Sequence, residues 1–173
     1  MKKNNCEFVE RDGLIYICTS CGDVAVVDNT PEIAEKVKAH SWYPHRKGYL
    51  HCKINGEHVA LHNFVTDCPD GMVVDHINHD TFDNRLVNLR VCTPKQNSYN
   101  REYKDGRVVG VRKIAATGKY KATIRKDGVA YNLGEFDTFR SAYSARYLAE
   151  YEMFGEFGPN VSKVIADSYG RVI

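Results

Sequence analysis

Residues 72–101 read MVVDHINHDTFDNRLVNLRVCTPKQNSYNR, and the fold of the chain is inferred outward from this stretch. A β-branched run leads into Asp75-His76, which predicts a short strand that carries this pair at its end. A second short strand is expected at 89–92, after which Thr93-Pro94-Lys95-Gln96 has the capping-box pattern of a helix start. The expected local order is therefore strand, loop, strand, helix, with Asn97 and Asn100 projecting together from the helix at a spacing of three.

The side chains in this stretch favour a particular chemistry. Asp75 offers a hard anionic oxygen, and Asn97 offers a neutral amide oxygen from a later helix. His76 has an unperturbed pKa of about 6.5, which suits a general base beside a bound cation. An oxygen-ligated cation with a neighbouring base is suited to hydrolysis of a phosphodiester, and this ligand set favours Mg²⁺ or Mn²⁺ over zinc.

The charge of the chain is distributed unevenly. The net charge is only +2, but residues 85–126 contain twelve Lys and Arg against two acids, a local charge of +10. The remaining residues carry a net charge of −8. A solvated basic face is the ordinary explanation of a short basic run, but the length of this block and its place beside Asp75-His76 favour a nucleic acid partner.

The region before the stretch is predicted to be rich in β-structure. Strands are expected at 14–18 and 24–28, followed by a helix with Thr30 as N-cap and Pro31 at its first position. Two alternating runs, 49–54 and 57–62, flank Asn55-Gly56, which predicts a tight hairpin because both turn residues must accept a positive φ.

The region after the stretch predicts a second unit. A short linker at 101–108 is followed by expected strands at 108–114, 120–126 and 130–136 and by a helix over about 138–154. Lys121, Thr123 and Arg125 alternate along one strand and so share a face. With Arg112 and Lys113 they are expected to form a basic sheet face.

These motifs resemble known families. Residues 72–101 resemble the HNH endonucleases, whose ββα-metal site is built on an Asp/His-His, Asn, His/Asn pattern. Residues 108–157, with GVR at 110–112 and LGEFDT at 133–138, resemble the ethylene-response-factor type of DNA-binding domain. The two in this order resemble phage and bacterial HNH homing endonucleases, and Trp42, Gly48-Tyr49 and Leu61-His62 fit the usual lead-in of that family.

The resemblance implies a role for each matching residue. Asp75 and Asn97 would hold a divalent cation, Mg²⁺ or Mn²⁺, and His76 would deprotonate the attacking water. Asn88 matches the middle Asn of the motif, which fixes the loop and orients the base. Thr117 and Asn132 stand where the plant domains commonly have Trp, so phosphate positioning is expected rather than plant-type base readout. The residues expected to contact DNA are Arg90, Lys95, Asn100, Arg101, Arg112, Lys113, Lys121, Thr123 and Arg125.

Other metal-like patterns have simpler interpretations. Cys18-x-x-Cys21 has no second pair to complete a structural zinc site, so a reduced turn is favoured over a zinc knuckle. His79 is interpreted as a loop residue and His62 as a packed histidine in a strand. The four other histidines, His40, His45, His51 and His58, have no convincing partners in the sequence.

The sequence therefore predicts an α+β protein with a ββα-metal core, a β-rich segment before it and a C-terminal three-stranded antiparallel sheet packed on one helix. The expected divisions are 1–104 for the nuclease region, 108–158 for the DNA-binding domain and 159–173 for a C-terminal tail. Composition and the lack of a long apolar run exclude a membrane protein, and a cytoplasmic enzyme of a bacterial or phage-infected cell is expected. It would act on double-stranded DNA as a monomer or weak dimer. The alternatives are a DNA-binding regulator with a vestigial nuclease site and, with little specific support, an RNA-directed nuclease.

Overall fold

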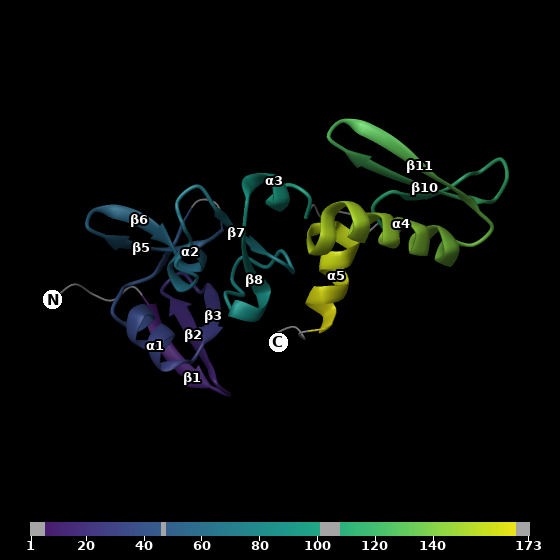
Figure 1. The fold of residues 1–173 in the computed structure, drawn as a ribbon. Coiled ribbons are helices and arrows are strands. Elements are labelled where there is room, and N and C mark those ends of the chain that lie inside the picture. Colours follow the sequence, from purple (N-terminus) through teal and green to yellow (C-terminus); the bar gives the residue numbers. More distant parts are fainter. Residues whose placement is uncertain (1–5, 46–47, 101–107, 169–173) are drawn as a thin grey trace. The chain divides into compact units, whose positions relative to one another are not determined.

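The computed structural model describes residues 6–45, 48–100 and 108–168 and divides the chain into two compact units, with the boundary between Pro94 and Lys95 (Figure 1). This boundary comes earlier than the expected one at 104. The expected linker falls almost entirely on residues 101–107, which lie outside the described residues. Asn97 and Asn100 consequently belong to the second unit.

The first unit opens with an antiparallel sheet in the order β1-β2-β3. The central strand, β2 (Leu14–Thr19), buries Ile15 and Ile17 completely, as its alternation predicts. The predicted strand β3 (Val24–Asp28) is confirmed. The sequence analysis missed β1 (Cys6–Arg11), because this strand lies at the sheet edge, is mostly exposed and carries charged residues that obscure the strand pattern.

A short helix then closes over this sheet. The predicted α1 (Pro31–Lys38) is confirmed, and the Thr30 hydroxyl caps it by accepting the Ile33 N–H at 3.3 Å. Trp42 is fully buried, and its indole N–H donates to the Val37 carbonyl at 2.9 Å. The indole is therefore both packed and hydrogen-bonded in the core of the first unit.

The predicted hairpin forms the centre of a second antiparallel sheet. β5 (Leu50–Ile54) pairs with β6 (Glu57–Ala60) across Asn55 and Gly56, whose φ values are 50° and 92°. Positive φ at both positions is what a two-residue hairpin turn requires. A two-residue strand, β4 (Tyr43–Pro44), completes this sheet.

The expected strand at 57–62 ends early. Its last residues belong to α2 (Leu61–Val65), so His62 lies in the first turn of a helix rather than in a strand. Leu61 and Val65 are both buried, and their spacing of four places them on one helical face. Leu61 fits both the two-residue period of a strand and the helical spacing with Val65, so the sequence pattern extends the strand alternation through this residue.

The expected strand–loop–strand–helix order is confirmed. β7 (Val73–His76) pairs antiparallel with β8 (Leu89–Cys92), and a single 3₁₀ turn at Leu86–Asn88 precedes β8. α3 (Pro94–Asn97) is only four residues long, so Asn100 lies beyond it and not on its face. Val74 and Leu89 pack into the core of the first unit, which anchors both strands.

The second unit is a three-stranded antiparallel sheet packed on one long helix, as predicted. Figure 1 shows α4 running along the β10–β11 ribbon, and Ala122, Ile124 and Ala142 are buried between sheet and helix. Thr138 caps the helix by accepting the Ser141 N–H at 3.1 Å. The elements are β9 (Val111–Lys113), β10 (Tyr120–Lys126), β11 (Val129–Phe136) and α4 (Phe139–Phe154).

The segment after Gly158 differs from the expected tail. After a 3₁₀ turn at Gly155–Phe157, residues Pro159–Ser168 form α5, which contacts α4 and buries Val161 and Ser162. The expected tail at 159–173 starts at Pro159, and proline is also favoured in the first turn of a helix. None of the helices in the described residues is long and apolar enough to cross a membrane.

Candidate functional site

His76 is the buried centre of the candidate site. It ends β7, where it is 6% exposed and pairs with Leu89 in register. Its Nε2 lies 3.3 Å from the Asn84 side-chain oxygen, while the Asn84 side-chain nitrogen donates to the Thr81 carbonyl at 3.3 Å. In this amide orientation the His76 Nε2 carries the proton, and Nδ1 is the basic nitrogen of the ring.

Burial also sets the protonation of His76. Desolvation lowers the pKa of His76 below its ordinary value, against the opposing effects of the Asn84 hydrogen bond and the carboxylates of Asp75, Asp80 and Asp83. The neutral imidazole, which is the form that can accept a proton, is therefore favoured at neutral pH.

Two aromatic rings, Tyr49 just before β5 and His62 in α2, form a wall beside His76. The His62 ring meets the His76 ring edge-on, with centroids 5.1 Å apart. The Tyr49 ring lies 4.9 Å from His62 and 6.0 Å from His76. Burial, followed by the proximity of His76 and His51, lowers the pKa of His62 to about 3, so this ring stays neutral. His62 is a packed histidine, as interpreted, but it packs against the candidate base.

Asp75 is bound by an arginine from the facing strand. Asp75 and Arg90 are register partners on β7 and β8, and the Arg90 Nε and Nη2 both donate to Asp75 Oδ2, at 2.8 and 2.6 Å. The two side chains are 6% and 8% exposed. The structure thus places Arg90 in a buried ion pair, which differs from the exposed phosphate contact that the basic block suggested.

Asn88 holds the loop between the two strands. Its side-chain oxygen accepts the Asn78 N–H at 3.0 Å, and its side-chain nitrogen donates to the Asp83 carbonyl at 2.8 Å. Its own backbone carbonyl accepts the Ile77 N–H at 2.9 Å. These contacts bring the two ends of the loop together beside His76, and they make the side chain, which is 2% exposed, a structural part of the site.

A salt bridge and two backbone hydrogen bonds to Val26 also hold this loop in place. Arg85 binds the buried Asp83 carboxylate through Nε and Nη2 at 2.8 and 2.7 Å. The Val26 N–H donates to the Phe82 carbonyl, and the Asn84 N–H donates to the Val26 carbonyl, at 2.9 and 2.8 Å. The loop is therefore attached to β3 on both sides of Asp83. The sequence analysis missed Asn84 and Asp83, although both stand in the DNR triplet of the quoted stretch.

The donor set at Asp75 fits a cation that water and substrate help to coordinate. Among the described residues, no group of three or more His, Cys, Asp or Glu side chains is placed to hold a metal ion. A closed structural zinc site needs four such ligands, whereas Mg²⁺ usually takes one or two carboxylates plus phosphate and water. The two Arg90 hydrogen bonds both go to Asp75 Oδ2, and a carboxylate has about four lone-pair positions in all. Asn97, the other expected ligand, is half-buried and belongs to the second unit.

The remaining histidines and cysteines give no further centre of this kind. His79 is an exposed turn residue with φ 63°, as expected for a loop. Cys18 and Cys21 are free thiols. The sequence did not show that His45, His51 and His58 pack together. The His45 ring lies 4.5 Å from His51 and 6.2 Å from His58, whose Nδ1 is 2.7 Å from the Tyr43 hydroxyl. His40 packs edge-on against Phe64 at 5.2 Å.

The second unit presents a mixed but mainly cationic sheet face. Arg112 lies opposite Lys121 in register, and Thr123 and Arg125 continue along the same face of β10. Ala122 and Ile124 point the other way and are buried. The face also includes Glu135, the register partner of Lys121.

Lys113 does not share this face, contrary to expectation. It is the register partner of Tyr120, and its Nζ lies 5.9 Å from the centre of that ring. Tyr120 in turn meets Phe139 of α4 at 5.8 Å, so Lys113 lies on the helix side of the sheet. The error arises because Arg112 and Lys113 are adjacent, and adjacent strand residues point to opposite faces.

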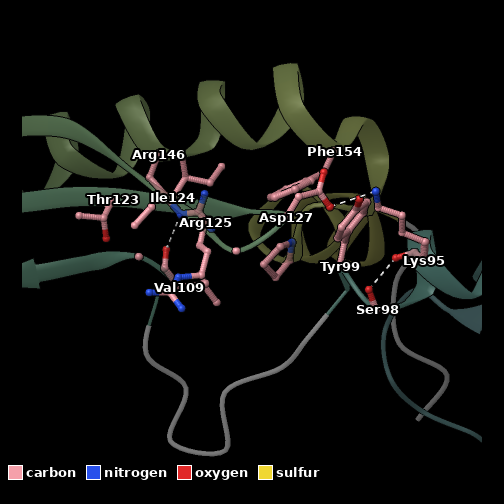
Figure 2. A pocket seen from close by; sticks show the side chains of 14 residues that line it. Lys95, Ser98, Tyr99, Val109, Thr123, Ile124, Arg125, Asp127, Arg146 and Phe154 are labelled. Atoms are coloured by element: carbon pink, nitrogen blue, oxygen red, sulfur yellow. Dashed lines mark hydrogen bonds and ion pairs between the residues drawn. The ribbon is translucent and has the colours of Figure 1, made fainter.

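A hollow of about 800 Å³ adjoins the end of the cationic face (Figure 2). Arg125 lines it, together with Tyr99 and Phe154, whose rings are tilted by 31° with centroids 4.5 Å apart. Lys95 also lines it and forms a 3.0 Å salt bridge with Asp127. Among the other residues expected to contact DNA, Asn100 is buried, and Arg101 lies outside the described residues.

Comparisons with known proteins point to one family. A family model described as HNH endonuclease matches residues 58–99. The chain is 34% identical over 131 residues to the uncharacterized HNH endonuclease L560 of Acanthamoeba polyphaga mimivirus, a match that covers 72% of this chain and 68% of that protein. It is 36% identical over 56 residues to YosQ, an SPbeta prophage-derived candidate HNH homing endonuclease of Bacillus subtilis strain 168, covering 30% of this chain and 32% of YosQ. No solved structure matches.

Proposed function

Because the chain belongs to the HNH endonuclease family, we propose that it is a site-selective, homing-type DNA endonuclease that hydrolyses a phosphodiester by metal-assisted attack of water. The observation that carries this proposal is the placement of His76. A buried, neutral imidazole is oriented by Asn84 at the end of β7, directly after a carboxylate. The homing-type assignment is supported by the similarity to YosQ, a candidate homing endonuclease, and by the two-unit organisation.

The chain's own residues divide the reaction between them. His76 accepts the proton of the attacking water at Nδ1, while Asn84 keeps the proton on Nε2 and so fixes the direction of the ring. Asn88 orients the base indirectly, because it holds the loop that carries Asn84. Asp75 and Asn97 would hold Mg²⁺ or Mn²⁺, which when bound polarises the phosphate and stabilises the charge on the leaving oxygen.

The second unit supplies DNA contacts in this proposal. Arg112, Lys121, Thr123 and Arg125 lie on one sheet face, where the cations bind phosphates and hold the duplex in register. The β-β-β-α order of 108–157 and its resemblance to ethylene-response-factor domains support this role. One catalytic centre cuts one strand per engagement, so a double-strand break requires two chains or two successive events.

A metal-dependent plasmid assay tests the proposal. Wild type should convert supercoiled plasmid to nicked or linear forms with Mg²⁺ or Mn²⁺ and should stop on addition of EDTA. Asp75→Ala, His76→Ala and Asn97→Ala should lose cleavage and still shift duplex DNA in a gel. Retained cleavage after exhaustive chelation would exclude the hydrolytic scheme. DNA binding without cleavage under any metal would favour the alternative, a DNA-binding regulator with a vestigial site.

A further inference from the structure

Arg90 stands in the basic block of the sequence, but its guanidinium is not at the surface. The side chain is 8% exposed, and two of its nitrogens donate to one oxygen of Asp75, at 2.8 and 2.6 Å. Both residues lie in paired strands that pack into the core through Val74 and Leu89. The position of the guanidinium is therefore determined by the protein interior.

This geometry suits the orientation of a carboxylate better than the binding of a phosphate. An arginine that contacts the DNA backbone must reach solvent, as the exposed Arg125 does. The planar guanidinium of Arg90 instead restrains the Asp75 carboxylate through two charge-assisted hydrogen bonds, which fix its rotation as well as its position. It also places a positive charge directly against this carboxylate.

We infer that Arg90 is a positioning residue of the metal site, which orients Asp75 for the cation, and that it is not a DNA phosphate contact. The inference deepens the proposed function and rests on it, because it takes Asp75 as the metal ligand. Partners that orient metal ligands in this way typically change metal affinity by 10–100-fold when they are removed. A phosphate contact would instead contribute up to about 0.9 to the log–log dependence of DNA affinity on salt.

Two measurements on the full chain separate the two roles. The first is the Mn²⁺ dissociation constant by electron paramagnetic resonance, with duplex DNA bound in the His76→Ala background so that the DNA is not cut. The Mn²⁺ signal that Asp75→Ala removes defines the site. The second is the salt dependence of duplex affinity. Arg90→Gln is compared with Arg125→Gln, a matched change at an exposed arginine of the second unit.

Arg90→Gln should raise the Mn²⁺ dissociation constant at least tenfold and leave the salt slope at the wild-type value. Arg125→Gln should leave the Mn²⁺ constant unchanged and flatten the salt slope. Arg90→Lys keeps the charge without the planar fork, and it should weaken Mn²⁺ binding by a smaller factor. Circular dichroism identifies folded variants, and if Arg90→Gln does not fold, Arg90→Lys carries the same comparison.

A wild-type Mn²⁺ constant in the folded Arg90 variants, or a flattened salt slope, would overturn the inference. Failure of the proposed function has a different signature. If the proposed function is wrong, Asp75→Ala in a protein that keeps Arg90 removes no Mn²⁺ signal. That result would mean that Asp75 is not a metal ligand.

Discussion

An arginine–carboxylate pair lies buried in each of the two units, and these two pairs differ in what surrounds them. In the first unit, Arg90 and Asp75 face each other across two short strands, next to His76. In the second unit, Arg146 and Glu150 are one turn apart on α4, with a separation of 2.8 Å and side-chain exposures of 5% and 0%. The chemistry of the two pairs is the same, but their neighbours are not.

The pair on α4 is enclosed by backbone and by a third polar side chain. Asn160 donates to both oxygens of Glu150, through its backbone and side-chain nitrogens, at 2.9 and 2.8 Å. A Cβ on Gly110 would lie 2.3 Å from Arg146 Nε, and one on Gly158 would lie 2.9 Å from Glu150 Cβ. This pair joins α4, α5 and the residues before β9 and has a structural role. Under the proposed function, the pair beside His76 belongs to the reactive site and the pair on α4 does not.

The largest expected effect is that of replacing His76, which lies beside the Arg90–Asp75 pair. His76→Ala should reduce cleavage by roughly 10²–10⁴-fold, the usual contribution of a general base, while DNA affinity stays close to wild type. The measurement is single-turnover cleavage of a duplex substrate alongside a mobility shift. Wild-type cleavage by His76→Ala would show that the base is elsewhere.

Disrupting the Arg146–Glu150 pair should lower the stability of the second unit rather than change the reaction. Glu150→Ala leaves Arg146 buried without its carboxylate and should destabilise the second unit by about 3–5 kcal/mol. Hydrogen exchange measured by mass spectrometry should show faster exchange in peptides from 108–168 and unchanged exchange in those from 6–94. Equal loosening of both units would mean that they do not unfold independently.

Acid should affect the two units unequally, because all seven histidines lie between residues 40 and 79. Burial lowers the pKa of His62 to about 3 and also lowers the pKa values of His51 and His76. A depressed folded-state pKa contributes stability above the unfolded value, near 6.5, and that stability is lost as the pH falls below it. His62 alone should remove about 2 kcal/mol from the first unit between pH 7 and pH 5.

The single tryptophan makes this acid effect measurable. Trp42 is fully buried in the first unit, so its fluorescence during denaturant unfolding reports that unit. The helical circular dichroism signal is dominated by α4 and α5 and reports the second unit. His62→Phe, which keeps a ring in the wall, should show a smaller acid loss than wild type. An equal loss in the variant would mean that His62 does not contribute.

The smallest expected effect tests the cationic face residue by residue. Lys121→Gln should flatten the salt dependence of DNA affinity by up to about 0.9 in log–log slope. Lys113→Gln makes the same chemical change on the helix side of the sheet and should leave the slope unchanged. The two variants are compared by measuring their DNA affinities at salt concentrations from about 50 to about 200 mM. Equal slopes for the two variants would mean that the face of Lys121 does not contact DNA.

Short sequence motifs predicted the turns and helix starts that depend only on neighbouring residues. Asn55-Gly56 predicted the hairpin because only those turn residues accept two positive φ values easily, and Thr30-Pro31 predicted the start of α1. The positions of Asp75, His76 and Asn88 in one strand–loop–strand segment followed from their spacing alone, and their roles in metal binding and catalysis stay predictions.

The missed features depend on contacts between distant parts of the chain. Arg90 looked like a surface cation, because nothing local shows that register places it opposite Asp75. Asn84 and His62 became part of the site only through packing against His76. The helix at Pro159–Ser168 was missed because it packs on α4, and residues 159–173 were expected to form a C-terminal tail.

The attachment of the catalytic loop to β3 bears on how such a nuclease can be exchanged between proteins. Val26 is hydrogen-bonded to Phe82 and Asn84, and the Leu86 N–H donates to the Asp28 carboxylate at 2.7 Å. A graft of residues 72–101 alone would leave these partners behind, and the residue that orients the base would lose its backbone support. Recombination that keeps the chemistry intact should therefore transfer β3 together with the loop. Because Asn97 lies beyond the boundary at Pro94 and Lys95, a transfer that keeps both proposed metal ligands should extend past that boundary to include Asn97.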